Sequence, residues 1–384
     1  MKTYNIFYVL LALIIFSCSE ADQGSGEGLG GGETTSIDAD YAVLLEKAGN
    51  ITTQLLNANR EVMTLNPSES ALVKTASPLL VEVLGSKFLQ YQKNADCTAT
   101  ITMHDFSTDT NEEIEVFSDF NDCSLQAMAI TLSEQSLFIA YQLDLDGKNK
   151  ENKVRVIDLG TSEPSFVDIE IAEKPIDLVI ANNRLFVMTL DEEITDENNL
   201  TVIDLATTTL IHKMSLGNDV RRFFKNRVGN IIISYDELHT TLNSDSMAFV
   251  YTNYENGKEP NFTSVQADFF DNNGRMYYRM NPATYSEYDA SPAIYDFSKN
   301  LTIIYSFENF LTGAQRNLEF EIENTTVVGY DSENDLILIG YKKSSGNDKG
   351  GLLRITPNPL PDKPAFIDKI NLDGVPTQII VNYN

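Results

Sequence analysis

The sequence predicts an all-β protein that folds as a seven-bladed β-propeller, with six blades as the alternative. Three observations favour this fold class. Short strands in which apolar and polar residues alternate recur with a period of roughly 45–55 residues. No helical pattern separates these strands, and one strand pattern without partners is left over at the C-terminal end of the chain.

The clearest repeated element is a strand that ends in an aspartate followed by a bulky apolar residue. It occurs at Lys153–Gly160, Leu200–Ala206, Thr100–Ser107 and, more loosely, Pro292–Ser298. The aspartates are Asp105, Asp158, Asp204 and Asp296. Because aspartate side chains accept hydrogen bonds from turn amides, we expect each of them to cap the turn that follows its strand.

Four strands per repeat are typical of a propeller blade. This pattern places six blades on residues 76–122, 123–173, 174–218, 219–264, 265–321 and 322–374. The strand pattern Thr377–Tyr383 needs partners, and Tyr41–Leu65 contains three further strand patterns. Joining the two ends makes a seventh blade and removes the exposed edges of the sheet. In the six-bladed alternative, Tyr41–Asn59 is an amphipathic helix that precedes the ring.

The blades with Val-Ile-Asp-Leu strands resemble the YVTN-type repeats of seven-bladed, WD40-like propellers in secreted bacterial proteins. The resemblance is clearest over residues 123–218 and fades in the last three blades. It implies the fold and no particular chemistry, since such propellers include binding proteins, scaffolds and a few enzymes.

The N-terminus carries a secretion signal. Lys2 precedes Ile6–Phe16, an apolar run of eleven residues that is too short to span a bilayer but is typical of a signal peptide. The sequence Ile15-Phe16-Ser17-Cys18 resembles a lipobox, although Phe16 departs from the small residue often found at its position. The resemblance implies a lipoprotein signal peptide over residues 1–17 and lipid, including palmitate, on Cys18. The alternative is an ordinary secretory signal with an incidental cysteine.

Residues 18–36 are predicted to be a tether, because glycine and acidic residues dominate them, and the propeller is predicted over residues 37–384. The acidic start of the tether, Ser19–Asp22, resembles the export signals that send some Gram-negative lipoproteins to the outer face of the outer membrane. A plain solvated linker is the alternative. We therefore expect a protein that is exposed at the cell surface and is held at the outer membrane by its lipid anchor only.

The cysteines predict one disulfide. The chain has three of them, and lipid takes Cys18. Cys97 and Cys123 remain, an even number in an oxidising compartment, so we expect them to be bonded to each other.

The charge of the chain narrows the choice of partners. Its 28 basic and 56 acidic residues leave a formal net charge of −28. Such a surface repels phosphate backbones and anionic lipids, so nucleic acid is excluded and the propeller body is not expected to lie on a membrane. The excess acid is interpreted mainly as a means of keeping the protein in solution, while a cation, a basic protein or a neutral glycan remain open as partners.

One face of the propeller is the predicted binding surface. In this fold, the connections between second and third strands and those between blades emerge on the same face, which we call the loop face. The long predicted loops are nearly all of the second-to-third kind, namely Asp144–Asn152, Asp191–Asn199, Asp236–Ser246, Asn281–Ser291 and Lys342–Gly350. Because long loops on a rigid scaffold usually carry binding, we expect partners on the loop face rather than on the opposite turn face.

A weak calcium site is one candidate on the loop face. Asp144, Asp146 and Glu151 resemble the start of a calcium loop, in which hard oxygen ligands surround the ion. Glu151 follows Gly147 by four residues rather than the six of that motif. Solvated acidic loops are therefore the favoured interpretation, so no cofactor is expected, and calcium stays open as the alternative.

Two further groups are binding candidates. Arg221 and Arg222 begin a first strand, and first strands line the central channel, so one of them is expected near Asp177 of the preceding blade. A structural ion pair and the binding of an anion are the alternatives. Tyr285 and Tyr288 lie in a polar loop, where contact with a partner and plain loop packing are equally open.

Catalytic motifs are not evident in the sequence. His104, His212 and His239 fall in different predicted blades, so they cannot share a metal ion. Asp245-Ser246-Met247 resembles the context of bacterial O-glycosylation, which makes Ser246 a weak candidate for modification.

Two functions follow from these observations. The first is a non-catalytic binding or scaffold propeller, an accessory subunit of an outer-membrane complex for nutrient uptake, secretion or outer-membrane protein assembly. The second is a metal-dependent hydrolase, similar to a lactonase, that uses carboxylates at the mouth of the channel.

Overall fold

The computed structural model describes residues 39–72, 75–76, 78–120, 123–147, 149–161, 165–193, 197–262, 269–281, 286–346, 348–357 and 364–382. The predicted signal peptide (1–17), Cys18 and the rest of the predicted tether (to residue 36) lie outside the described residues. Within the described part, the only helical segments are the short η1 (Phe307–Asn309) and η2 (Gln315–Glu319). None of the helices found there has the length and apolar character needed to cross a membrane.

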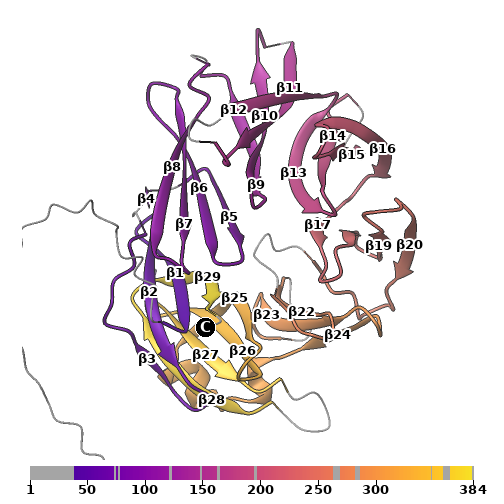
Figure 1. Ribbon diagram of the computed structural model, residues 1–384. Helices are drawn as coiled ribbons and strands as arrows, with labels where there is room; N and C mark the ends of the chain where they lie inside the picture. Colours follow the sequence, from indigo (N-terminus) through magenta and orange to yellow (C-terminus); the bar gives the residue numbers. More distant parts are fainter. Residues whose placement is uncertain are drawn as a thin grey trace, which may run out of the picture. The chain divides into compact units, whose positions relative to one another are not determined.

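Six antiparallel four-stranded sheets follow one another along the chain, and each is a simple meander (Figure 1). Blade 1 holds β5 (Leu80–Leu84), β6 (Lys87–Lys93), β7 (Ala99–Asp105) and β8 (Thr110–Val116). Blade 2 holds β9 (Gln126–Leu132), β10 (Ser136–Asp144), β11 (Lys150–Asp158) and β12 (Ser165–Ile171). Blade 3 holds β13 (Lys174–Ala181), β14 (Arg184–Asp191), β15 (Glu197–Asp204) and β16 (Thr209–Gly217).

The second half of the ring continues the pattern. Blade 4 holds β17 (Arg222–Lys225), β18 (Ile231–Ser234), β19 (Leu238–Leu242) and β20 (Phe249–Asn253). Blade 5 holds β21 (Phe269–Phe270), β22 (Arg275–Met280), β23 (Ser291–Asp296) and β24 (Leu301–Ile304). Blade 6 holds β25 (Ile322–Asp331), β26 (Leu336–Lys343), β27 (Gly350–Ile355) and β28 (Phe366–Leu372).

The seventh blade joins the two ends of the chain. The C-terminal strand β29 (Val375–Val381) is its innermost strand and pairs with β1 (Tyr41–Lys47), which pairs in turn with β2 (Asn50–Ala58) and β3 (Met63–Leu65). The two-residue strand β4 (Thr75–Ala76) adds to β2. The seven-bladed prediction is thus confirmed, and the alternative of an N-terminal helix is wrong because this segment forms strands.

Burial follows the position of a strand in its blade. Second strands such as β10 and β26 are buried almost throughout, because neighbouring blades cover both of their faces. Fourth strands such as β16 and β20 lie at the outer rim and are largely exposed. The hydrophobic core is therefore divided into clusters between blades. One of them joins Leu89 and Ile101 of blade 1 to Leu137 and Ile139 of blade 2.

The aspartates at the ends of third strands cap turns, as predicted. Asp105 Oδ1 accepts hydrogen bonds from the amide and the hydroxyl of Ser107, and Asp204 Oδ1 accepts the same pair from Thr207. Asp296 caps Ser298 in this way, and Asp158 accepts from the amide of Gly160. These local hydrogen bonds stabilise the turns that connect third strands to fourth strands.

A buried polar network fastens the seventh blade to the sixth. The Tyr41 hydroxyl donates to Asp331 Oδ2, and Arg354, which is 0% exposed, forms two hydrogen bonds with Asp368. Arg354 also donates to the carbonyl oxygen of Asn59, and Asp368 accepts from the Met63 amide. N-terminal and C-terminal segments are thus held by directional bonds as well as by strand pairing.

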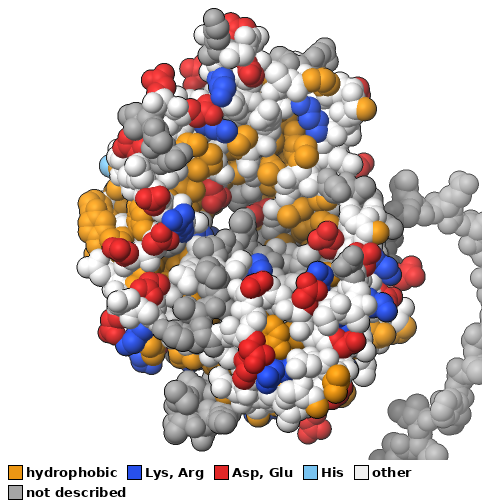
Figure 2. Space-filling view, turned by 180° about the vertical axis from the view of Figure 1, so that it is seen from behind, with side chains coloured by type: hydrophobic (Ala, Val, Ile, Leu, Met, Phe, Trp, Pro, Cys, Tyr) orange, Lys and Arg blue, Asp and Glu red, His pale blue; other side chains and the backbone are white. Residues whose placement is uncertain are grey.

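Acidic residues are spread over the surface. Figure 2 shows Asp and Glu side chains distributed across one side of the molecule, with fewer Lys and Arg side chains between them. This distribution fits the net charge of −28. The described residues contain no group of three His, Cys, Asp or Glu side chains that could hold a metal ion.

Candidate functional site

The loop face carries the connections between second and third strands, which differ in length from blade to blade. The second-to-third connection spans residues 145–149 in blade 2, 192–196 in blade 3 and 344–349 in blade 6. The predicted loop Asp236–Ser246 is wrong, because Leu238–Leu242 forms β19. His239 and Thr240 are buried there by neighbouring strands, although their sequence is polar.

A disulfide ties two connections of the loop face together, and this prediction is confirmed. Cys97 lies between β6 and β7, Cys123 lies between blades 1 and 2, and their sulfur atoms are bonded. The Lys93 ammonium adds hydrogen bonds to the carbonyl oxygens of Cys123 and Leu125, at 2.7 and 2.8 Å. The passage from blade 1 to blade 2 is therefore held at three points.

Glu192 links blades 2 and 3. Its carboxylate accepts a hydrogen bond from Lys150, the first residue of β11, at 2.8 Å and from Lys174, the first residue of β13, at 3.4 Å. Gln142, which is buried, lies 3.5 Å from the same carboxylate. The two lysines lower the pKa of Glu192, mainly through the hydrogen bond from Lys150. Glu192 of blade 3 is thus joined to the start of β11 in blade 2.

The central channel lies between the first strands of the blades. It forms a cavity of about 1140 Å³ that is lined mainly by first strands, including β5, β13, β17 and β29. Most of the wall is apolar, with Val83, Val179 and Ile379 among the lining residues. Asp177 and Arg222 supply charge from adjacent first strands.

Asp177 has an unusual titration in this channel. Burial raises the pKa of its carboxyl group to about 6, against a hydrogen bond from the Leu178 amide and the charge of Arg222, which lower it. The guanidinium of Arg222 lies 4.7 Å from the centre of the Phe224 ring. The structure thus brings Arg222 and Asp177 into one electrostatic environment.

The other predicted arginine has a different partner. Arg221 lines the cavity and forms two hydrogen bonds of 2.7 Å with Asp236, an exposed residue of the turn between β18 and β19. An exposed pair of this kind contributes little to stability, and it holds the guanidinium at the edge of the channel.

Of the two predicted aromatic binding residues, the structure describes only Tyr288. Tyr288 is only 8% exposed and packs edge-on against Phe307 at 4.9 Å, so the structure shows loop packing at this residue. Tyr285 lies outside the described residues. In blade 4, Tyr251 is 62% exposed on β20.

The acidic residues of the predicted calcium loop are engaged locally. Asp144 Oδ1 accepts from the Gly147 amide, and Asp146 accepts from the amide and the side chain of Asn149. Glu151 forms an ion pair of 2.6 Å with Lys153. Each carboxylate therefore serves its own turn or strand neighbour.

The weak modification candidate lies on the turn face. Ser246 is exposed in the connection between β19 and β20, where its hydroxyl donates to Asn243 Oδ1. Nearby, Arg184 of blade 3 donates to the carbonyl oxygens of Ser244 and Asp245. Ser246 is therefore separated from the predicted binding candidates of the loop face.

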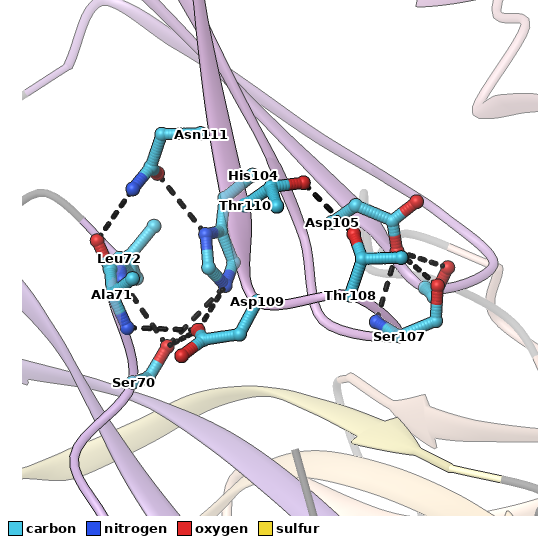
Figure 3. Close-up of polar contacts among 11 residues, drawn as sticks. Ser70, Ala71, Leu72, His104, Asp105, Ser107, Thr108, Asp109, Thr110 and Asn111 are labelled. Atoms are coloured by element: carbon cyan, nitrogen blue, oxygen red, sulfur yellow. Dashed lines mark hydrogen bonds and ion pairs between the residues drawn. The ribbon is translucent and has the colours of Figure 1, made fainter. Parts of the chain in front are cut away.

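A serine, a histidine and an aspartate meet in blade 1, and the sequence analysis did not predict this group (Figure 3). The Ser70 Oγ lies 3.3 Å from His104 Nε2 and 3.2 Å from Asp109 Oδ1. His104 Nε2 and Asp109 Oδ1 are 3.5 Å apart, and His104 Nδ1 lies 3.0 Å from Asn111 Oδ1. Asn111 Nδ2 donates to the Ala71 carbonyl oxygen, so His104 Nδ1 carries the proton.

This geometry belongs to a structural latch rather than to a nucleophile. In a catalytic triad the serine and the acid contact opposite ring nitrogens, whereas Ser70 and Asp109 both face Nε2. The Ser70 Oγ already accepts the Leu72 amide, and His104 is 0% exposed. Burial is the main cause that lowers the pKa of His104, so the ring is neutral at pH 7. The bonds fasten the segment after β3 to the hairpin of β7 and β8.

The remaining histidines stay apart from this group. His239 is buried in blade 4 beside Tyr254, and burial lowers its pKa to about 4. His212 lies on β16 of blade 3. The prediction that the three histidines belong to different blades is confirmed.

Comparison with known proteins bears on the fold. No protein-family model matches the chain, and no curated protein matches its sequence. Among solved structures, a puromycin hydrolase mutant in complex with PGG is similar with a TM-score of 0.51 and 8% identity, over 84% of this chain and 52% of that chain. A candidate 6-phosphogluconolactonase from Bacteroides fragilis is similar with a TM-score of 0.51 and 12% identity, over 91% of this chain and 100% of that chain.

These similarities show the propeller fold. The chain spans about half the length of the puromycin hydrolase chains that it matches. At 8–12% identity, the likeness does not extend to the chemistry of either protein.

Proposed function

We infer that this chain is a lipid-anchored, non-catalytic binding propeller of the YVTN-like type, held at the outer surface of the outer membrane. In this role it is an accessory subunit of an envelope complex for nutrient uptake, secretion or outer-membrane protein assembly. The lipobox-like sequence ending in Cys18 and the acidic residues after it support the location.

The observation that carries the binding role is the cross-tied loop face. The Cys97–Cys123 disulfide, the Lys93 contacts and the Glu192 bridge join described residues of blades 1, 2 and 3 to one another on this face. A surface that is already ordered loses less conformational entropy on binding, which favours recognition. The histidine nearest to a serine and an aspartate is occupied by structural bonds, which gives no support to hydrolysis there.

The anchor is tested in the native host by the variant Cys18→Ser. We expect the wild-type protein to incorporate labelled palmitate and to remain with outer membranes, and the variant to lose both properties. Protease treatment of intact cells then reports the face of the membrane, and a protected protein would contradict surface exposure.

The binding role is tested by gentle detergent extraction and affinity purification of the full-length lipoprotein. We expect a membrane protein in constant stoichiometry. The variant Glu192→Lys, which replaces the bridge by a repulsive contact with Lys150 and Lys174, should weaken this recovery several-fold. Recovery of the lipoprotein alone from several mild detergents would overturn the proposal.

A hydrolase is the second candidate, and one observation favours it. Asp177 lies in the channel with a pKa of about 6, a value that suits a general acid or base near neutral pH. Titration of acid release from a panel of lactones, with Asp177→Asn as the matched control, tests it. If the wild-type protein releases acid and Asp177→Asn does not, the result supports a hydrolase function. Equal rates for the two proteins would exclude a catalytic role for Asp177.

A further inference from the structure

The outer rim of blades 2, 3 and 4 carries apolar side chains at equivalent positions. They occupy the first three residues of the fourth strands. We call this group the apolar belt, and its members are Phe166, Val167, Leu210, Ile211, Phe249, Val250 and Tyr251. Every member is between 46% and 65% exposed. Figure 2 shows hydrophobic side chains gathered at the edge of the molecule where β20 lies.

The fourth strands of blades 1 and 5 do not expose apolar side chains in this way. The equivalent positions of β8 in blade 1 hold Asn111 and Glu112, and Glu113 follows them. In blade 5, β24 is half-buried, and the Thr302 hydroxyl donates to the carbonyl oxygen of Lys258 in the connection from blade 4. Asn300, just before β24, donates to the carbonyl oxygen of Asn253, the last residue of β20. In blade 7, the outermost strand β3 exposes one large apolar side chain, Leu65, at 53%. Exposed apolar side chains that recur at equivalent positions of adjacent blades are typical of a protein interaction site.

The strand β20 is the strongest part of the belt. It is the last strand of its sheet and pairs only with β19 within the described residues. It has no charged residue and no proline, the features by which exposed edge strands normally avoid pairing with other chains. The rings of Phe249 and Tyr251 lie edge-on at 5.3 Å, and the Arg155 guanidinium lies 3.9 Å from the centre of the Phe166 ring. The aromatic members are therefore held in place before binding, as interface anchors are.

The charge around the belt selects the kind of partner. Exposed acidic residues lie near both ends of β20. Asp245 precedes the strand in the chain, Glu255 follows it and pairs with Lys258, and the carbonyl oxygen of Glu237 accepts a hydrogen bond from the Tyr254 amide just after the strand. A second copy of this chain would bring the same acidic flanks and its own net charge of −28 to the contact. An extended apolar segment with basic residues at its ends matches both the open edge and its surroundings.

We propose that β20 and the apolar belt form a docking surface, distinct from the loop face, for an extended apolar strand of another protein that is flanked by basic residues. The strand adds to the edge of β20, and its alternate side chains contact Val250 on one face and Phe249 and Tyr251 on the other. The basic flanks meet the acidic residues at the two ends of β20. This surface stands independently of the role proposed for the loop face.

The test uses the purified full-length lipoprotein in detergent micelles and a defined probe. The probe is a fluorescent peptide of six alternating Val, Ile and Thr residues with two lysines at each end, and a second peptide carries glutamates in place of the lysines. We expect the lysine peptide to bind and the glutamate peptide to bind at least tenfold more weakly. The variant Val250→Glu/Tyr251→Glu, which imitates blade 1, should reduce binding of the lysine peptide at least tenfold.

Matched controls separate docking from damage. The variant Glu112→Gln alters the equivalent position of blade 1 and should leave binding unchanged. The belt variant should unfold at the wild-type urea concentration, because the side chains that it replaces are exposed. Equal binding of both peptides, equal binding by the belt variant, dimerisation of the lipoprotein through β20 or belt-dependent binding to phosphatidylethanolamine vesicles would each overturn the proposal.

The two proposals can fail separately. If the belt variant loses the peptide and keeps the membrane partner recovered by gentle extraction, both surfaces act. If it keeps the peptide, the belt proposal fails whatever the membrane partner does.

Discussion

The pKa of Asp177 depends on its buried position in the central channel. Its carboxyl group has a folded-state pKa of about 6 because of burial, against an ordinary value of about 3.9 in an unfolded chain. Between these values the folded state binds more protons than the unfolded state. The free energy of unfolding therefore falls as pH rises from about 4 to about 6 on account of this group.

The variant Asp177→Asn tests this coupling. We expect it to raise the free energy of unfolding at pH 7.5 by about 2 kcal/mol and to have little effect at pH 4, because the asparagine cannot ionise. Urea unfolding at the two pH values measures the difference. A variant that is equally stabilised or destabilised at both values would show that ionisation of Asp177 is not the cause.

Arg155 is a second residue whose replacement should change the free energy of unfolding strongly, because of the contacts that it makes. It is 1% exposed, forms ion pairs of 2.6 Å with Asp119 and 2.7 Å with Asp168, and lies against Phe117 and Phe166. Its hydrogen bonds are the main cause that lowers the pKa of Asp119.

Arg155→Met should lower the free energy of unfolding at pH 7 by about 3 kcal/mol, since it leaves two carboxylates without their partner. The loss should shrink in acid, as pH falls through the lowered pKa of Asp119, because protonation of that carboxyl group removes its ion pair with Arg155 in the wild-type protein. Thermal or urea unfolding measures it, with Arg155→Lys as the control that retains the charge. A loss that does not change with pH would assign the effect to packing alone.

At the scale of elements, ring closure depends on a single strand. The C-terminal β29 supplies the innermost strand of blade 7 and contributes Ile379 and Ile380 to buried clusters on its two sides. Without it, β1 loses a full row of backbone hydrogen bonds, and the apolar neighbours of β29 become exposed.

Truncation after Asp373 should therefore prevent cooperative folding. We expect the shortened chain to lose its unfolding transition in urea and to bind a hydrophobic dye, whereas removal of residues 383–384 alone should have no effect. A cooperative transition in the shortened chain would mean that six blades and three N-terminal strands are stable by themselves.

At the scale of the whole molecule, the net charge of −28 has a predictable cost. Exposed like charges repel one another most strongly when the chain is compact, and salt screens this repulsion. We expect the free energy of unfolding to rise by about 1 kcal/mol between 10 and 200 mM NaCl.

Urea unfolding over this salt range provides the measurement. KCl should act like NaCl, because screening does not depend on the identity of the cation. A rise with one cation only would point to a specific ion site instead.

Local signals in the sequence were sufficient for the elements and the architecture. Alternating residues marked the strands, and the aspartates at their ends marked the turns, because both signals act within a few residues. The count of blades followed from the strand at 377–383 that lacked partners. The Cys97–Cys123 pair followed from counting cysteines. The strand at Leu238–Leu242 escaped this approach because its polar residues, His239 and Thr240, are buried by neighbouring strands and not by their own periodicity.

Most side-chain contacts between distant segments were decided only by the tertiary structure. Tyr41 and Asp331 are 290 positions apart, and Ser70 and His104 lie on segments that no pattern connects. The same holds for the burial of Tyr288 and for the apolar belt, which exists because equivalent strands of three blades lie at one rim. Periodicity encodes which face of a strand is apolar, but the neighbour that covers this face, or leaves it open, is set by how the blades close into a ring.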